Sequence, residues 1–393
     1  MRKLSAHYVF PVEGPPLEKG IVHIDDDGTI LELIDTGGKL REEASLEFYN
    51  GIIVPGFVNA HCHLELSHLK ELVPERTGLE EFLLKINRER HFDRNHIRAR
   101  VAEAHAEMLR NGIMGVGDIC NTADSFGVKG NGDISYVSFL EVFGLNPQEA
   151  DGLIKKAMDL AGIIEREVPH PHFMVPHAPY TMSESLFVKL SLLVENQISS
   201  IHNQECQGEF RLFKSHDGPM YELLLSTGPY IKYWKPKSHN PLAHALNFLS
   251  GARKILLVHN TYSTKDDVLL AEKGPPEIIW VLCPNANLYI EDKLPDLPLL
   301  TARDQTIALG TDSLASNHGL SILEEMKTLH RTFTEATLQN CIRWGTLNGA
   351  RALDLDHTLG SIRRGKKPGL NLIYDMDLWG LKFNPETKVR KLA

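Results

Sequence analysis

Two histidines separated by one residue are the strongest sign of chemistry in this sequence. His61 and His63 stand in the stretch VPGFVNAHCHLELSHL, directly after an apolar run typical of a buried strand. Alternate residues of a strand point to the same face, so both imidazoles leave the chain on one side. Such a pair can hold a metal ion, or it can be two solvated histidines on an exposed edge.

More histidines and one aspartate follow other strand-like runs. These residues are His177 in VPHAPYT, His202 followed by Glu205 in IHNQE, His259 in LLVHN and Asp312 in ALGTDS. A single histidine at a strand end is weak evidence for a function. Five histidines and one aspartate, all at the carboxyl ends of predicted strands, favour one shared site.

The residue types suggest how the roles are divided. Four of them offer ligand atoms for a catalytic Zn²⁺, with Fe²⁺ or Mn²⁺ as alternatives: His61, His63, His202 and Asp312. A water on such an ion becomes a nucleophile near neutral pH. Glu205 is predicted to move a proton and His259 to hydrogen-bond the activated water, while Asp312 accepts the proton of that water.

Alternating strands and helices must position these side chains. Strands are predicted at residues 53–59, 114–118, 135–143, 173–177, 198–203, 255–259, 278–283 and 306–311. Helical periodicity separates most of them, as in residues 80–89 and 97–111. This pattern predicts an α/β fold with a TIM-type (β/α)8 barrel, whose active site gathers at the carboxyl ends of the strands.

The two ends of the chain contain short β-like runs. Residues 1–54 hold several of them, and residues 355–393 hold a further strand candidate at 370–374. Neither end is long enough to bury a core alone. We therefore predict one small β domain from residues 1–54 and 355–393, with residues 55–354 forming the barrel.

Composition and charge limit the classes of function. The formal net charge of −9 argues against a nucleic-acid surface, and no apolar window reaches the ~18 residues of a membrane helix. No apolar segment typical of a secretory signal follows the basic start of the chain, and the five cysteines are widely separated. We expect a cytoplasmic enzyme with a small-molecule substrate and no nucleic-acid or membrane partner. The sequence leaves open whether the protein forms a homodimer.

The motifs together resemble the amidohydrolase superfamily, in its mononuclear aminohydrolase branch. The matching segments run in family order from residue 55 to residue 317: PGFVNAHCH, HAPYT, the His202–Glu205 pair, LVHNTY, CPNANLYI and GTDSLASN. The chain ends are similar to the small β-sandwich that these enzymes attach to a distorted TIM barrel. The resemblance implies the ligand, proton-shuttle and water-polarising roles named above, and it makes His177 a substrate contact.

Other parts of the resemblance concern the number of metals and the substrate. Residues 79–83 resemble a segment in which one acidic residue reaches a ribose, which leaves Glu80 and Glu81 as candidates. Binuclear relatives bridge two metals with a carboxylated lysine, and the strand ending at His177 has no lysine. One metal is therefore expected. Glu141 is the residue that could support a second metal, and otherwise it lines the pocket.

The run from His63 to Ser67 is similar to aminodeoxyfutalosine deaminases, which act on a 6-aminopurine nucleoside. Close relatives deaminate S-adenosylhomocysteine, methylthioadenosine or guanine. Glu65 and Ser67 are therefore expected to face the substrate, unless they cap the following helix. Asn203 and Ala286 depart from the residues usual in this family, and they put the substrate rather than the chemistry in doubt.

The expected reaction is hydrolytic deamination of a 6-aminopurine nucleoside or a related heterocycle. One alternative keeps the site but opens a cyclic amide or removes chlorine from a ring. The other is a metal-binding barrel without catalysis. The presence of Glu205 and His259 argues against the last, because a structural zinc site needs neither.

Overall fold

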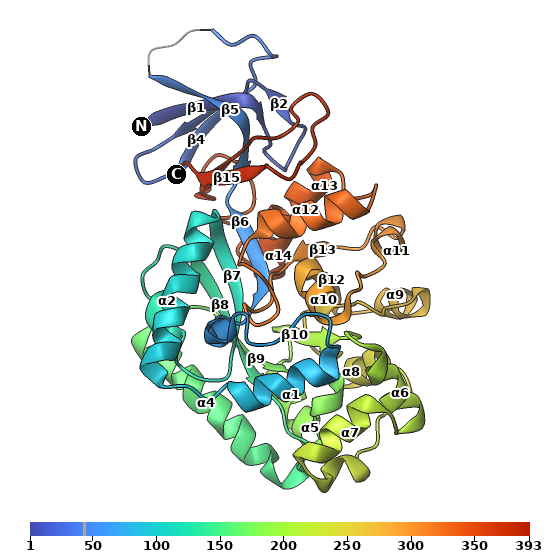
Figure 1. Ribbon diagram of the computed structural model, residues 1–393. Helices are drawn as coiled ribbons and strands as arrows, with labels where there is room; N and C mark the ends of the chain where they lie inside the picture. Colours follow the sequence, from blue (N-terminus) through green and yellow to red (C-terminus); the bar gives the residue numbers. More distant parts are fainter. Residues whose placement is uncertain (42–44) are drawn as a thin grey trace.

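Strands from both ends of the chain share one sheet. The computed structural model describes residues 1–41 and 45–393, and both termini lie at this sheet, at the top of Figure 1. Its strand order is β15-β14-β5-β1-β3-β4, with β2 beside β1. The strands are β1 (Arg2–Val9), β2 (Leu17–Glu18), β3 (Ile21–Ile24), β4 (Ile30–Ile34), β5 (Leu46–Pro55), β14 (Leu370–Tyr374) and β15 (Lys388–Lys391). β14 runs antiparallel to β5, which joins the two ends of the chain.

The rest of the strands form two parallel sheets. One has the order β6 (Phe57–Cys62), β7 (Ile113–Cys120), β8 (Ser135–Val142) and β9 (His172–Pro176). The other has the order β10 (Ile198–Asn203), β11 (Lys254–His259), β12 (Glu277–Leu282) and β13 (Ile307–Leu309). The backbone N–H of His202 donates to the carbonyl of His177 over 2.9 Å, and a parallel bridge joins Cys62 to Asp312. The predicted α/β class with parallel strands is confirmed.

Helices cover these sheets and carry their apolar residues inward. They are α1 (Leu79–Glu89), α2 (Arg94–Arg110), α3 (Phe126–Lys129), α4 (Ala150–Glu167), α5 (Glu184–Leu193), α6 (Gln207–Ser215), α7 (Pro219–Thr227), α8 (Pro241–Leu249), α9 (Lys265–Ala271), α10 (Pro284–Glu291), α11 (Leu297–Ala302), α12 (Ile322–Thr332), α13 (Leu338–Arg343) and α14 (Gly349–Ala352). Shorter turns are η1 (Leu64–Leu69), η2 (Pro147–Glu149), η3 (Pro179–Thr181), η4 (Pro229–Lys232) and η5 (Trp344–Asn348).

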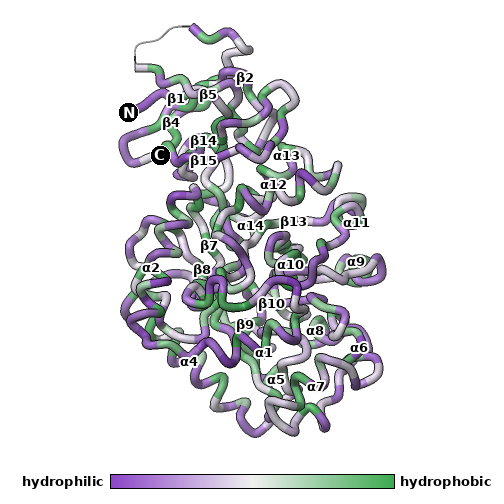
Figure 2. Tube along the Cα trace, viewed as in Figure 1, coloured by the Kyte–Doolittle hydropathy of each residue, from purple (hydrophilic) through white to green (hydrophobic). Residues whose placement is uncertain are grey.

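The hydropathy of the outer helices alternates along the chain, as Figure 2 shows for α2 and α4. In α2 the buried residues are Val101, Ala104, His105 and Met108, at steps of three and four that place them on one face. This periodicity packs the helix onto the sheet. Within the described ranges 1–41 and 45–393, no helix has the length and apolarity needed to cross a membrane.

The first parallel strand begins later than predicted. Residues 53–55, which we expected in this strand, form the end of β5 in the sheet built from both chain ends, and β6 starts at Phe57. Gly56 lies at the junction, where its N–H donates to the carbonyl of Gly369 over 3.1 Å. The apolar run is continuous in the sequence, so periodicity alone could not divide it between two sheets.

Replacing Gly56 with alanine is expected to destabilise the fold by about 1–3 kcal/mol. A Cβ atom there would overlap Met114 and lie 2.5 Å from the carbonyl oxygen of Pro368. The denaturation midpoint measures this effect. Gly127→Ala is the matched control, because nothing lies within 4 Å of a Cβ at that position. Equal midpoints for the two variants would contradict the close approach at Gly56.

Candidate active site

The side chains predicted to bind metal converge on one point. They come from β6 and the residue after it, from β10, and from the residues after β13: His61, His63, His202 and Asp312. The Nε2 atom of His63 is 3.1 Å from that of His61 and 3.2 Å from that of His202. Oδ1 of Asp312 lies 3.6 Å from Nε2 of His61 and 3.5 Å from Nε2 of His63. Segments far apart in the sequence thus meet at the carboxyl ends of the strands.

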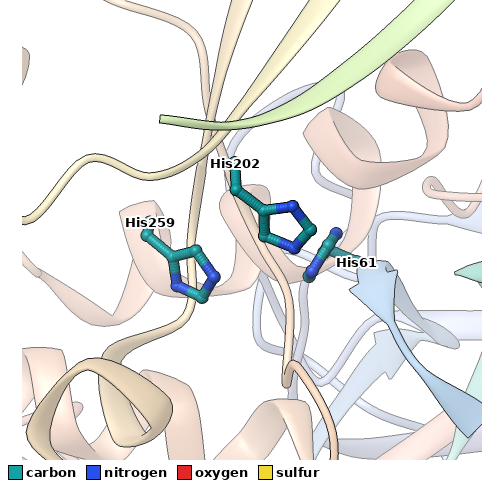
Figure 3. Close-up of side chains that lie close together, drawn as sticks. All are labelled: His61, His202 and His259. Carbon is teal, nitrogen blue, oxygen red and sulfur yellow. The ribbon is translucent and has the colours of Figure 1, made fainter. Parts of the chain in front are cut away.

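Hydrogen bonds fix which imidazole nitrogens are free. Nδ1 of His202 is 2.7 Å from the carbonyl oxygen of His177, which can only accept, so Nδ1 carries the proton and Nε2 has a lone pair. Nδ1 of His259 is 2.9 Å from Oδ1 of Asn287, whose Nδ2 donates to the His259 carbonyl over 3.3 Å. His259 therefore also presents an unprotonated Nε2. Figure 3 shows the rings of His61, His202 and His259 facing a common space.

Burial sets the charges of this cluster. It lowers the pKa of His63 to about 3, and it lowers the pKa values of His61 and His202 as well. Burial raises the pKa of Asp312, but the nearby imidazoles of His61, His63 and His259 outweigh this and hold the pKa well below its usual value. Neutral imidazoles and one charged carboxylate therefore face one another at neutral pH.

The spacing of these atoms fits a tetrahedral metal ion. Four ligands at zinc–nitrogen and zinc–oxygen bond lengths of ~2.0–2.1 Å stand about 3.3 Å apart. The distances from His63 to the other three ligand atoms are 3.1, 3.2 and 3.5 Å. Lone pairs that converge in a buried site without a donor between them are unfavourable unless a cation binds there. His61, His63, His202 and Asp312 could therefore hold one divalent metal.

Glu205 and His259 stand beside this point. Oε1 of Glu205 is 3.6 Å from Nε2 of His259, and Glu205 is only 6% exposed. Burial raises the pKa of Glu205 well above its usual value, and the charge of Asp312 raises it further. This carboxyl group can therefore hold a proton near neutral pH and pass it to a bound molecule.

The backbone at three of these strand ends is left-handed. Gln204, His259 and Asp312 have φ values of 49°, 73° and 56°. This conformation is uncommon for residues with a Cβ atom and is found most often at functional sites. It turns the chain sharply after each strand and aims the neighbouring side chains into the cluster.

The profile of the amidohydrolase family matches residues 232–390. This part of the chain is thus similar to the amidohydrolase family. Together with the cluster of histidines and Asp312, this match confirms the predicted metal-dependent hydrolase. The 5-methylthioadenosine/S-adenosylhomocysteine deaminase of Clostridium tetani is 23% identical over 372 residues, which cover 88% of this chain and 79% of the relative.

Two solved structures share the fold of this chain. The aminofutalosine deaminase of Helicobacter pylori, in complex with methylthio-coformycin, superposes with a TM-score of 0.78 at 20% identity. The match covers 95% of this chain and 92% of that one. An adenosine deaminase of Xanthomonas campestris with bound zinc has a TM-score of 0.72 at 22% identity, over 98% and 86% of the two chains. At these identities the likeness shows the fold alone.

The positions of His177 and Glu141 argue for a single metal in this protein. Nδ1 of His177 bonds Oγ1 of Thr181 over 3.1 Å, and the ring of His177 lies 4.7 Å from that of His202. Oε1 of Glu141 is 3.8 Å from Nδ1 of His202. A second ion between these residues would need Nδ1 of His202, which already donates to the His177 carbonyl. Glu141 is better described as a pocket-lining residue.

The structure separates the two candidates on α1. Glu80 points toward the chain after β10, where its Oε1 lies 3.8 Å from Sγ of Cys206. Glu81 faces solvent, and its side chain is 51% exposed beside Lys85 at 3.5 Å. Glu80 is therefore the acidic residue of this segment that can reach a molecule bound at the cluster.

Glu65 and Ser67 were expected to face the substrate or to cap the following helix. Glu65 lines a cavity of about 630 Å³. Its oxygens accept from the N–H groups of Asn121 and Thr122 and from the Thr122 hydroxyl, so it holds the loop after β7 instead of capping η1. Ser67 does not line this cavity, and its hydroxyl is buried without a partner among the described residues. Burial raises the pKa of Glu65 to about 7.

Asn287 is a functional candidate that the motif analysis did not single out. It lies within CPNANLYI, and the signal for it is the spacing from Cys283 on the first turn of α10, which aims its amide at His259. Ser316 was likewise missed. Its hydroxyl donates to Oδ2 of Asp312 and leaves Oδ1 facing the histidines.

Replacing Asn287 with alanine is expected to lower kcat by about 10–100-fold without removing the metal. The change frees the ring of His259 to rotate or to adopt the other tautomer. Steady-state kinetics and metal content measure the two effects separately. Asn247→Ala is the control, because Asn247 is exposed and its amide donates to the carbonyl of Ala243 in its own helix. Unchanged kcat in Asn287→Ala would contradict the positioning role.

Proposed function

We propose that this amidohydrolase is a zinc-dependent deaminase that acts on a 6-aminopurine nucleoside. The observation that carries the proposal is a protonatable carboxyl group, Glu205, held 3.6 Å from a neutral His259 beside four converging metal-ligand atoms. A ligand set closed to water would need neither group. The deaminases among the similar proteins support the same reaction, and the zinc in one of them supports the choice of metal.

The chain's own residues account for each proton in the reaction. His61, His63, His202 and Asp312 would hold the ion, which when bound supplies an activated water. Oδ1 of Asp312 takes one proton from the attacking water, and Nε2 of His259 accepts a hydrogen bond from it. Glu205 protonates the ring nitrogen next to the reacting carbon, then takes the proton of the added hydroxyl group and passes it to the departing amine. The proton on Asp312 afterwards restores the protonated form of Glu205. Water is consumed and ammonia is released.

Two contacts would hold the substrate around the reacting ring. His177 keeps an inward-facing Nε2, because its Nδ1 is bonded to Thr181. Glu80 would accept hydrogen bonds from the ribose hydroxyls, since it is the inward-facing carboxylate of α1. Replacing Glu80 with glutamine should raise KM for nucleosides more than it lowers kcat, whereas Glu81→Gln should change neither.

We also infer that the two parallel sheets close into one (β/α)8 barrel over residues 55–354. The hydrogen bond from β10 to His177 and the bridge between Cys62 and Asp312 support closure on both edges. Residues 1–54 and 355–393 would form the small β-sandwich domain, supported by the pairing of β5 with β14. The five described cysteines are all free and buried, which supports a cytoplasmic location.

Ammonia release from the zinc-loaded protein tests the proposed function. The panel contains adenosine, 5′-methylthioadenosine, S-adenosylhomocysteine, guanine, cytosine and small cyclic amides. We expect ammonia from the adenosine compounds only. If cyclic amides are opened instead, or if every amine is left intact while the metal stays bound, the proposed deamination is wrong.

A further inference from the structure

A buried carboxyl group outside the metal cluster joins two of the segments that support the cluster. Glu325 lies in the first turn of α12, and its side chain is fully buried. Its Oε2 accepts from the backbone N–H of Asn285 over 2.8 Å. Its Oε1 accepts from the side-chain amide of Asn285 over 3.1 Å and from that of Asn317 over 2.8 Å. The proposed reaction makes no use of this group.

The contact with Asn285 caps a neighbouring helix. The first four N–H groups of a helix have no partner within it, and Asn285 is the second residue of α10. Glu325 therefore supplies from α12 an acceptor that α10 lacks, at the end of the helix where a carboxyl group is favoured. Two residues further along α10, Asn287 bonds Nδ1 of His259 over 2.9 Å. The cap thus holds the helix that orients His259.

The contact with Asn317 holds the loop after β13. The amide of Asn317 donates to Glu325 and also to the carbonyl of Thr311, over 2.9 Å. Thr311 directly precedes Asp312 in the chain. Ser316, whose hydroxyl donates to Oδ2 of Asp312, directly precedes Asn317. Asn317 therefore closes the loop that carries Asp312, and Glu325 fixes this closure to α12.

Other contacts turn the donors of both amides toward Glu325. The Thr311 carbonyl can only accept, so the nitrogen of the Asn317 amide must face it and Glu325. The hydroxyl of Thr328, on the next turn of α12, donates to Oδ1 of Asn285 over 2.6 Å, which turns the nitrogen of that amide toward Glu325. An amide in place of Glu325 would set a donor against a donor in a buried site, which is unfavourable.

We propose that Glu325 is a positioning residue that fixes Asp312 and His259 relative to one another. It joins the loop of Asp312 to the start of α10, and α10 in turn orients His259. In the proposed reaction Asp312 and His259 act on the same water, so a change in their relative position affects the attack itself. The inference rests on the proposed function and adds to it a residue that acts through its neighbours instead of on the substrate.

Replacing Glu325 with glutamine tests this role. We expect kcat of the zinc-loaded variant to fall by about 10–100-fold and the zinc Kd to rise by about 10-fold. KM should change by less than about threefold, because the proposed substrate contacts lie elsewhere. The visible spectrum of the Co²⁺-substituted protein should also change, since it reports the ligand geometry. Glu324→Gln is the matched control and should keep the native values, because Glu324 is exposed and pairs with Lys327.

A double-mutant cycle separates positioning from a general loss of stability. Asn317→Ala removes the link between Glu325 and the loop of Asp312, and it should raise the zinc Kd by a similar factor. If Glu325 acts through Asn317, the double variant should bind zinc within about threefold of the weaker single variant, whereas independent losses multiply. Asn247→Ala again serves as the control, since Asn247 is exposed.

Two results would overturn the inference: a folded Glu325→Gln variant with native zinc Kd and Co²⁺ spectrum, or a double variant whose losses multiply. If Glu325→Gln does not fold, Asn317→Ala decides, because a raised zinc Kd supports the role and a native one overturns it. If the native protein deaminates no adenosine compound, the proposed function fails. The zinc Kd and the Co²⁺ spectrum then still decide whether Glu325 positions the cluster.

Discussion

Replacing Glu205 with glutamine is expected to lower kcat by about 10²–10⁴-fold while the protein keeps its metal. Glutamine has the shape of glutamate but cannot take up and release a proton. Glu209 is the nearest further carboxylate on this segment, and it cannot substitute, because its Oε1 accepts from the backbone N–H groups of Glu205 and Cys206. Ammonia release and metal content measure the two parts of the prediction.

Comparing substrate binding with kcat distinguishes the loss of a proton shuttle from the loss of a substrate contact. Glutamine resembles the protonated form of Glu205, so substrate binding should change much less than kcat. Glu81→Gln provides a matched control, since it removes an exposed carboxylate from α1. If Glu205→Gln retains full turnover, Glu205 is not the proton shuttle.

Replacing Asp312 with asparagine is expected to abolish metal binding and to lower kcat/KM by at least about 10³-fold. Asp312 is the one negative charge among the four converging ligands, and it also accepts the water proton in the proposed reaction. Asparagine tolerates the left-handed backbone at this position, where φ is 56°, so the fold should be preserved. Zinc per chain and ammonia release measure the losses, and excess zinc should not restore turnover.

Asp304→Asn is the control for this variant. Asp304 is exposed and also has a left-handed backbone, with φ of 50°, so the control makes the same chemical change in the same conformation away from the cluster. It should keep native zinc content and turnover. Native zinc content in Asp312→Asn would show that Asp312 is not a ligand.

Much of the strand pattern could be predicted because each strand is a local signal. β10 has the bounds that the sequence predicts, 198–203. β6 is displaced to Phe57–Cys62, because the glycine that divides the apolar run is required by contacts with Met114 and Pro368. Those contacts join segments that are distant in the sequence, and no local pattern carries them.

The same distinction applies to the side chains of the site. The identity and order of His61, His63, His202 and Asp312 are written in motifs of a few residues, and from them the sequence alone predicted a metal-dependent hydrolase. Glu80 and Glu81 are neighbours with the same side chain, so only the packing of α1 decides which one faces the cluster.

The tertiary structure decided everything that depends on a partner far along the chain. It aims Asn287 at His259 and the His177 carbonyl at His202, and so selects the nitrogen that each imidazole presents. A sequence records which groups are available, but tautomers and distances follow from which groups the folded chain brings together.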